Sequence, residues 1–104
     1  GTRFVLPLKP RTRIDHIVLR ENLKNGHAVR AFFVELLKNG KAVKTFRAKA
    51  IGNKRIFRFP AAETDELCLT IQEYADTPEI TEFSCFLADD FSLREKIRMR
   101  FDRQ

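Results

Sequence analysis

Apolar and polar side chains alternate with period two along most of this chain, and this feature most limits how it can fold. The clearest case is Glu66–Tyr74, in which aliphatic residues occupy every second position: Leu67, Leu69 and Ile71. Successive side chains of a strand point to opposite faces, so this alternation predicts a strand with one buried face. The chain is therefore expected to consist mainly of β-strands.

Turn residues separate several further segments that show the same alternation. Asn39-Gly40 is the strongest hairpin signal, because both residues tolerate a positive φ. Pro7 and Pro10 restrict the first segment to an edge strand or an extended lead-in, and Pro60 is expected to end a strand by removing a ladder donor. The predicted strands are Arg3–Lys9, Arg13–Arg20, Ala28–Leu37, Lys41–Ala48, Arg55–Phe59, Glu66–Tyr74 and Ile80–Leu87. Short strands at this spacing predict an all-β antiparallel sandwich or barrel.

The last residues follow a different pattern, so the chain divides into a sandwich over 1–90 and a tail over 91–104. Ser92-Leu-Arg-Glu95 fits a capping box, and Asp89-Asp90 fits the turn before it. Apolar residues then recur every fourth position, at Leu93, Ile97 and Phe101. We expect a short amphipathic helix. A strand is the alternative, because Ile97, Met99 and Phe101 also alternate with Arg98 and Arg100.

Length and charge narrow the classes of function. The chain has 104 residues, which suits one domain. Its net charge is +6 and its pI about 9.8, but the basic residues are spread along the chain and interleaved with acids. Without a dense basic tract, binding of nucleic acid is disfavoured, and a solvated surface is the favoured interpretation. No apolar stretch approaches the ~20 residues of a membrane span, and no signal peptide is visible.

The cysteines and histidines do not form a metal or disulfide framework. Cys68 is expected to face away from the leucines that flank it, and Cys85 to face the core with Phe83. A bridge between the two cysteines is not favoured. His16 and His27 are too few for a zinc site. We therefore expect no metal and no cofactor, with His16 packed in a strand and His27 exposed in a loop.

Three stretches together resemble the C-terminal domain of the α-L-fucosidases, family 29 of the glycoside hydrolases. They are His16–Phe32, Leu69–Phe83 and Ala50–Pro60. The last contains Ile51-Gly-Asn-Lys-Arg-Ile56, which is similar to the family's Thr-Ile-Gly-Tyr-Lys-Arg-Ile signature. The resemblance covers roughly Arg13 to Leu87. It departs from the family at His27-Ala28, where Gln-Arg is usual, and at Asn53, where an aromatic residue is common.

The resemblance implies a galactose-binding-like, discoidin-type jelly roll without its first strand. It also implies that a catalytic barrel lies upstream as the partner of this domain, and that the two catalytic carboxyl groups lie there and not in this chain. The expected location is extracellular or periplasmic, or lysosomal in a eukaryote. The sheet edge that the missing strand would occupy invites self-association, unless the tail or a neighbour covers it.

Alternating strands should gather the loops Glu21–His27, Lys49–Lys54 and Tyr74–Glu79 at one end of the sandwich, and Lys38–Lys41 with Ala61–Asp65 at the other. The first end contains the candidate ligand residues Glu21, Asn25, His27, Asn53 and Tyr74. Only Tyr74 offers an aromatic platform for a sugar. The favoured interpretation of Glu21 is an ion pair with Arg55. Three functions remain: a fucosidase accessory domain, an independent carbohydrate-binding module and, less favoured, a polyanion binder.

Overall fold

The computed structural model describes residues 2–24, 28–75, 77–88 and 99–100. All of its strands belong to one antiparallel sheet with the order β3-β2-β4-β1-β5-β6. The strands are β1 (Thr2–Glu21), β2 (Val29–Lys38), β3 (Lys41–Ala48), β4 (Arg55–Tyr74), β5 (Ile80–Phe86) and β6 (Met99–Arg100).

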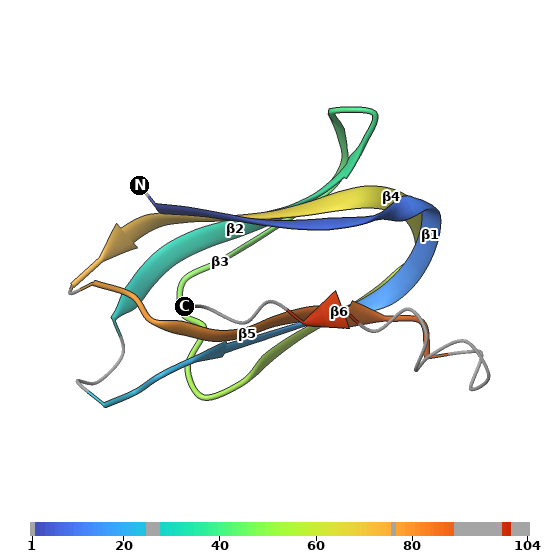
Figure 1. Cartoon of the computed structure of the whole chain (residues 1–104). Helices are drawn as coiled ribbons and strands as arrows, with labels where there is room; N and C mark the ends of the chain where they lie inside the picture. The colour runs from blue at the N-terminus through green and yellow to red at the C-terminus, as the bar shows by residue number, and fades with distance from the viewer. Residues whose placement is uncertain (1, 25–27, 76, 89–98, 101–104) are drawn as a thin grey trace.

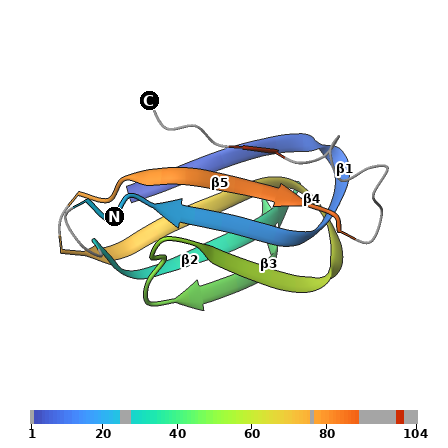
Figure 2. The same ribbon diagram turned by 90° about the horizontal axis from the view of Figure 1, so that it is seen from below.

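The sheet folds over on itself, and this fold makes the two layers of a sandwich (Figure 1). The two strands that make the bend, β1 and β4, are each 20 residues long and belong to both layers. The first half of β1 pairs with the second half of β4, beside β2 and β3. The second half of β1 lies between the start of β4 and β5 (Figure 2). The predicted all-β sandwich is confirmed, and its relation to the galactose-binding-like jelly roll stays a prediction.

Four of the predicted short strands are halves of these two long ones, and the prediction that Pro60 ends a strand is wrong. The β1–β4 register passes from Ile14 opposite Ala62 to His16 opposite Arg58. Residues 59–61 of β4 therefore lie opposite Asp15 alone. In such a bulge the proline has no ladder hydrogen bond to lose, so the strand bends at Pro60 and continues.

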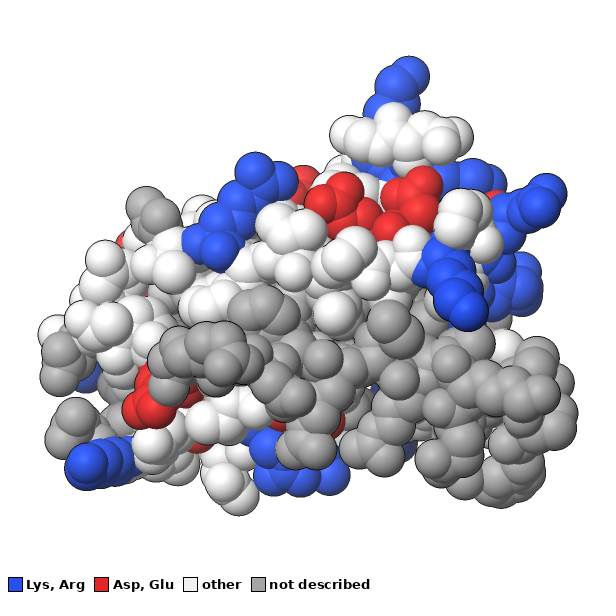
Figure 3. Space-filling model, viewed as in Figure 1, with Lys and Arg blue, Asp and Glu red and all other residues white. Residues whose placement is uncertain are grey.

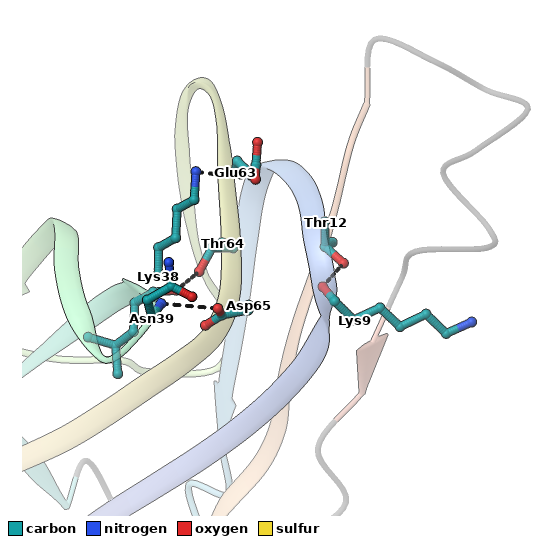
Figure 4. A network of polar contacts seen from close by, with 8 residues as sticks. Lys9, Thr12, Lys38, Asn39, Glu63, Thr64 and Asp65 are labelled. Carbon is teal, nitrogen blue, oxygen red and sulfur yellow. Dashed lines mark hydrogen bonds and ion pairs between the residues drawn. The ribbon is translucent and has the colours of Figure 1, made fainter.

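The end of the sandwich with the Asn39-Gly40 turn is fixed by polar contacts (Figure 4). Asn39 and Gly40 have φ values of 54° and 82°, which confirms the predicted hairpin. The buried Thr64 hydroxyl donates to the Leu37 carbonyl at 2.7 Å, and Asp65 accepts from the Asn39 N–H at 3.1 Å. The predicted meeting of residues 38–41 with 61–65 is confirmed.

The core lies between the two layers and is aliphatic and aromatic. Its fully buried side chains include Phe32, Phe83, Ile14, Ile17, Leu19, Leu36, Leu67, Leu69 and Ile71. Against them pack the rings of Phe46 and Phe57, whose centroids lie 5.2 Å apart. The alternation predicted for β4 is therefore confirmed, since its leucines enter this core.

Both cysteines are buried and free. Cys85 belongs to the core cluster, as predicted. Cys68 lies outside that cluster, and its Sγ accepts a hydrogen bond from Nε of the exposed Arg3 at 2.7 Å. The sulfur raises the pKa of Arg3 above its ordinary value, chiefly through this hydrogen bond. Cys68 is thus covered by a neighbouring side chain on the outer face, which matches the predicted orientation.

The N-terminal half of β1 tests the predicted edge strand, and strand β6 is the described part of the tail for which a helix was predicted. Thr2–Pro7 pairs with β4, whereas β5 pairs with β1 only at residues 16–21, so the predicted edge strand is confirmed within the described residues. In the tail, Met99 and Arg100 pair with Cys85 and Ser84 as strand β6 and are not helical. Residues 89–98 and 101–104, including the capping box and Asp89-Asp90, lie outside the described part. Among the residues that the structure describes, no helix is long and apolar enough to cross a membrane.

Candidate functional site

Three loops meet at the end of the sandwich opposite the Asn39-Gly40 turn, as the alternation of strands predicts. The N–H of Glu21 donates to the Gly52 carbonyl at 3.1 Å, and that of Asn22 to the Glu79 carbonyl at 2.9 Å. The N–H of Ala75 donates to the Ala28 carbonyl at 2.8 Å. Figure 1 shows the β1–β2 and β4–β5 connections side by side at this end.

The Glu21 side chain is the buried centre of this loop end. It is the last residue of β1 and only 3% exposed. Its Oε2 accepts hydrogen bonds from the backbone N–H groups of Ala28 at 2.8 Å and Val29 at 3.0 Å. Its Oε1 accepts one from the N–H of Gly52 at 3.3 Å. Both oxygens are therefore occupied, and the carboxylate holds two loops on the end of β1.

The predicted ion pair of Glu21 with Arg55 is not formed among the described residues. Because both Glu21 oxygens already accept backbone hydrogen bonds, the guanidinium has other partners. Its Nη1 donates to the Ala50 carbonyl at 3.5 Å, and its Cζ lies 5.3 Å from the centre of the Phe57 ring. The predicted tie between loop and strand exists, but backbone N–H groups supply it.

Of the four remaining candidate ligand residues, two lie among the described residues. Asn53 is exposed beside Gly52, and the side chain of Tyr74, which pairs with Val29 at the end of β4, is 46% exposed. Asn25 and His27 lie outside the described residues. Ligand roles for all of these residues stay predictions. In the described part of the chain, no group of three or more His, Cys, Asp or Glu residues could hold a metal ion.

A second polar cluster, which the sequence did not predict, lies on the outer face of the layer that contains β5 and the second half of β1. Glu82 is 3% exposed and its Oε1 lies 2.8 Å from Nε of Arg20, the residue opposite it on β1. Its Oε2 accepts a 2.6 Å hydrogen bond from the hydroxyl of the buried Ser84. Opposite charges at facing positions of paired strands could have signalled this pair. The cluster joins β5 to β1.

His16 and its neighbours extend this connection along the same two strands. The His16 ring stacks on Phe86, with centroids 4.5 Å apart, and its Nδ1 lies 2.7 Å from Oδ1 of Asp15. The same Asp15 oxygen accepts the N–H of Ala88 at 2.8 Å. The half-buried His16 is a packed strand residue, as predicted.

The fold and its loop end thus define a small antiparallel β-sandwich whose main buried carboxylates are occupied by internal contacts. No protein-family model matches the chain, and no curated protein matches it. Solved structures do match. One is a Bacteroides thetaiotaomicron protein assigned provisionally as an α-L-fucosidase, at 32% identity and a TM-score of 0.73, over 80% of this chain and 19% of that one.

Two further matches agree with the first. A Bacteroides ovatus protein with the same provisional assignment is 31% identical at a TM-score of 0.74, over 88% of this chain and 16% of its own. SpGH29 is 28% identical at a TM-score of 0.74, over 82% of this chain and 19% of its own. The chain thus spans less than a fifth of each relative. The resemblance to one domain of the family 29 α-L-fucosidases is confirmed.

Proposed function

We propose that this chain is a non-catalytic accessory domain of an α-L-fucosidase-like glycoside hydrolase, where it packs on the catalytic barrel and stabilises it. The observation that carries the proposal is the coverage of the matches: 80% and 88% of this chain against 19% and 16% of two relatives. A match of this kind is expected when a domain of a larger enzyme is compared with the whole. By the same resemblance, we propose an extracellular or periplasmic location.

The chemistry of the described residues supports a role without catalysis. Glycosidases in general need two carboxyl groups that flank the scissile bond, with both free to act on the substrate. The two buried glutamates, Glu21 and Glu82, accept hydrogen bonds from backbone N–H groups and from Arg20 and Ser84. Neither carboxylate is free to serve as acid or nucleophile.

Deletion of this domain tests the proposal in the enzyme that contains it. The intact enzyme should hydrolyse 4-nitrophenyl α-L-fucoside, and the isolated chain should not. Deleting the domain removes a packed partner, so the melting temperature of the catalytic domain should fall by roughly 5 °C, as a loss of one to two kcal/mol produces. Hydrolysis by the isolated chain, or an unchanged melting temperature and kcat/KM after deletion, would contradict the proposal.

The exposed Tyr74 ring favours a second candidate, a carbohydrate-binding module. A planar ring at a loop end, with amide and cationic side chains nearby, is a common way to hold a sugar. If the module binds sugar, calorimetry should detect fucose or a fucosylated oligosaccharide at millimolar concentration, and Tyr74→Ala should abolish the heat. Phe86→Ala, which removes the ring stacked on His16 at the end of β5, is the control and should leave the heat of binding unchanged. No binding by the unmodified chain would exclude this candidate.

A further inference from the structure

Three cationic side chains lie at alternate positions of β1, where the strand bends from one layer to the other: Lys9, Arg11 and Arg13. All three are exposed. Figure 3 shows that Lys and Arg side chains gather at this end of the molecule and at the hairpin above it, whereas Asp and Glu lie between them on the upper face. Cations of the bend and of the hairpin thus lie at the same end of the molecule, and we name Lys9, Arg11 and Arg13 the basic bend.

The backbone of the basic bend is fixed in shape. Pro7 precedes it and Pro10 lies within it, and each proline restricts its own φ. The Thr12 hydroxyl donates to the Lys9 carbonyl at 2.6 Å and closes the turn (Figure 4). Arg11 has a φ of 61°, a left-handed conformation that is uncommon for arginine. Such conformations are often retained where they serve a function, and a fixed loop loses little entropy on binding.

The acids nearest in sequence and register already have partners. Glu63 lies opposite Arg13 in the ladder, but its Oε2 is 3.2 Å from Nζ of Lys38. Asp65 accepts from Asn39, and Asp15 from His16 and Ala88. Among the described residues, the three cations of the basic bend form no ion pair. Within the described part of the chain, their positive charge is therefore not neutralised by an ion pair.

We propose that the basic bend binds a sulfated polysaccharide. Guanidinium groups bind sulfate-like oxyanions through paired hydrogen bonds. The turn holds three cations within residues 9–13, and such a cluster suits the repeated anionic groups of a polymer better than one small anion. Binding of single-stranded nucleic acid usually adds aromatic rings for base stacking, and residues 9–13 contain none. The inference rests on the proposed function, in which the parent enzyme acts on glycans.

The test compares two variants of the chain that lose the same charge. Lys9→Gln/Arg11→Gln/Arg13→Gln removes the basic bend. Lys24→Gln/Lys49→Gln/Lys54→Gln removes three exposed cations from the opposite loop end. Dextran sulfate should bind the unmodified chain in calorimetry, with an affinity that falls as salt is added. We expect the first variant to lose at least about tenfold in affinity and the second less than about threefold.

Equal losses in the two variants would overturn the proposal, because they would show a general charge effect. Binding of uncharged dextran, or equal affinity for mixed-sequence single-stranded DNA, would also overturn it. Far-ultraviolet circular dichroism establishes that each variant is folded. If the triple variant is not, the exposed single substitutions Lys9→Gln and Arg13→Gln must each weaken binding at least about twofold. Hydrolysis of 4-nitrophenyl α-L-fucoside by the parent enzyme tests the proposed function separately.

Discussion

Phe32→Ala is expected to destabilise the sandwich by about 3–5 kcal/mol, a large part of the stability of a domain this size. Phe32 is fully buried on β2, and its ring meets Phe57 edge to face with centroids 6.1 Å apart. Alanine leaves a cavity between the layers, because the close-packed neighbours, such as the Phe57 ring, can move only partly into the space that the Phe32 ring occupied. Urea unfolding followed by circular dichroism measures the loss.

Phe33→Ala is the matched control, since it removes the same side chain from the next position of the same strand. Phe33 is half-buried on the outer face, where its ring lies 5.0 Å from Cζ of Arg47. Loss of that contact and of some apolar area should cost about 1 kcal/mol. If the two variants unfold at the same urea concentration, the assignment of inner and outer faces on β2 is wrong.

The face assignments and the hairpin could be predicted because their causes are local. Leu67 and Leu69 face the core and Cys68 does not, since successive strand residues point to opposite sides. Asn39 and Gly40 both adopt positive φ, which few other pairs of residues tolerate in a two-residue turn. In each case a few neighbouring residues determine the conformation.

The bend was missed because it depends on both strands at once. A proline within a strand is incompatible with a regular ladder, and on that basis Pro60 was expected to end one. The structure instead places residues 59–61 in a bulge opposite Asp15, while β1 shifts register between Pro7 and Thr12. The bulges let the paired strands turn together, so β1 and β4 continue into the second layer. Only the register of both strands reveals this.

The role of Glu21 was missed for a related reason. Its charge suggested a cationic partner such as Arg55, but its actual partners are the backbone N–H groups of Ala28, Val29 and Gly52. Backbone donors carry no side-chain signature, and Gly52 is 31 residues away in sequence. The buried carboxylate satisfies donors that two loops would otherwise leave without a partner.

Glu21→Ala is therefore expected to cost about 3 kcal/mol or more, because the N–H groups of Ala28 and Val29 stay buried without an acceptor. Glu21→Gln should lose less, since one amide oxygen can still accept from both, while its NH₂ group would face the N–H of Gly52. Glu73→Ala, at an exposed position near the same end, should change the free energy of unfolding by less than about 0.5 kcal/mol.

Amide hydrogen exchange distinguishes this role from a general loss of stability. In Glu21→Ala, the amides of Ala28, Val29 and Gly52 should exchange faster than global unfolding allows, because the loop end opens locally. Core amides of β4, such as that of Leu69, should follow only the change in global stability. If Glu21→Ala unfolds at the same urea concentration as Glu73→Ala, or if the three loop amides stay protected, then Glu21 is not what holds the loops on the end of β1.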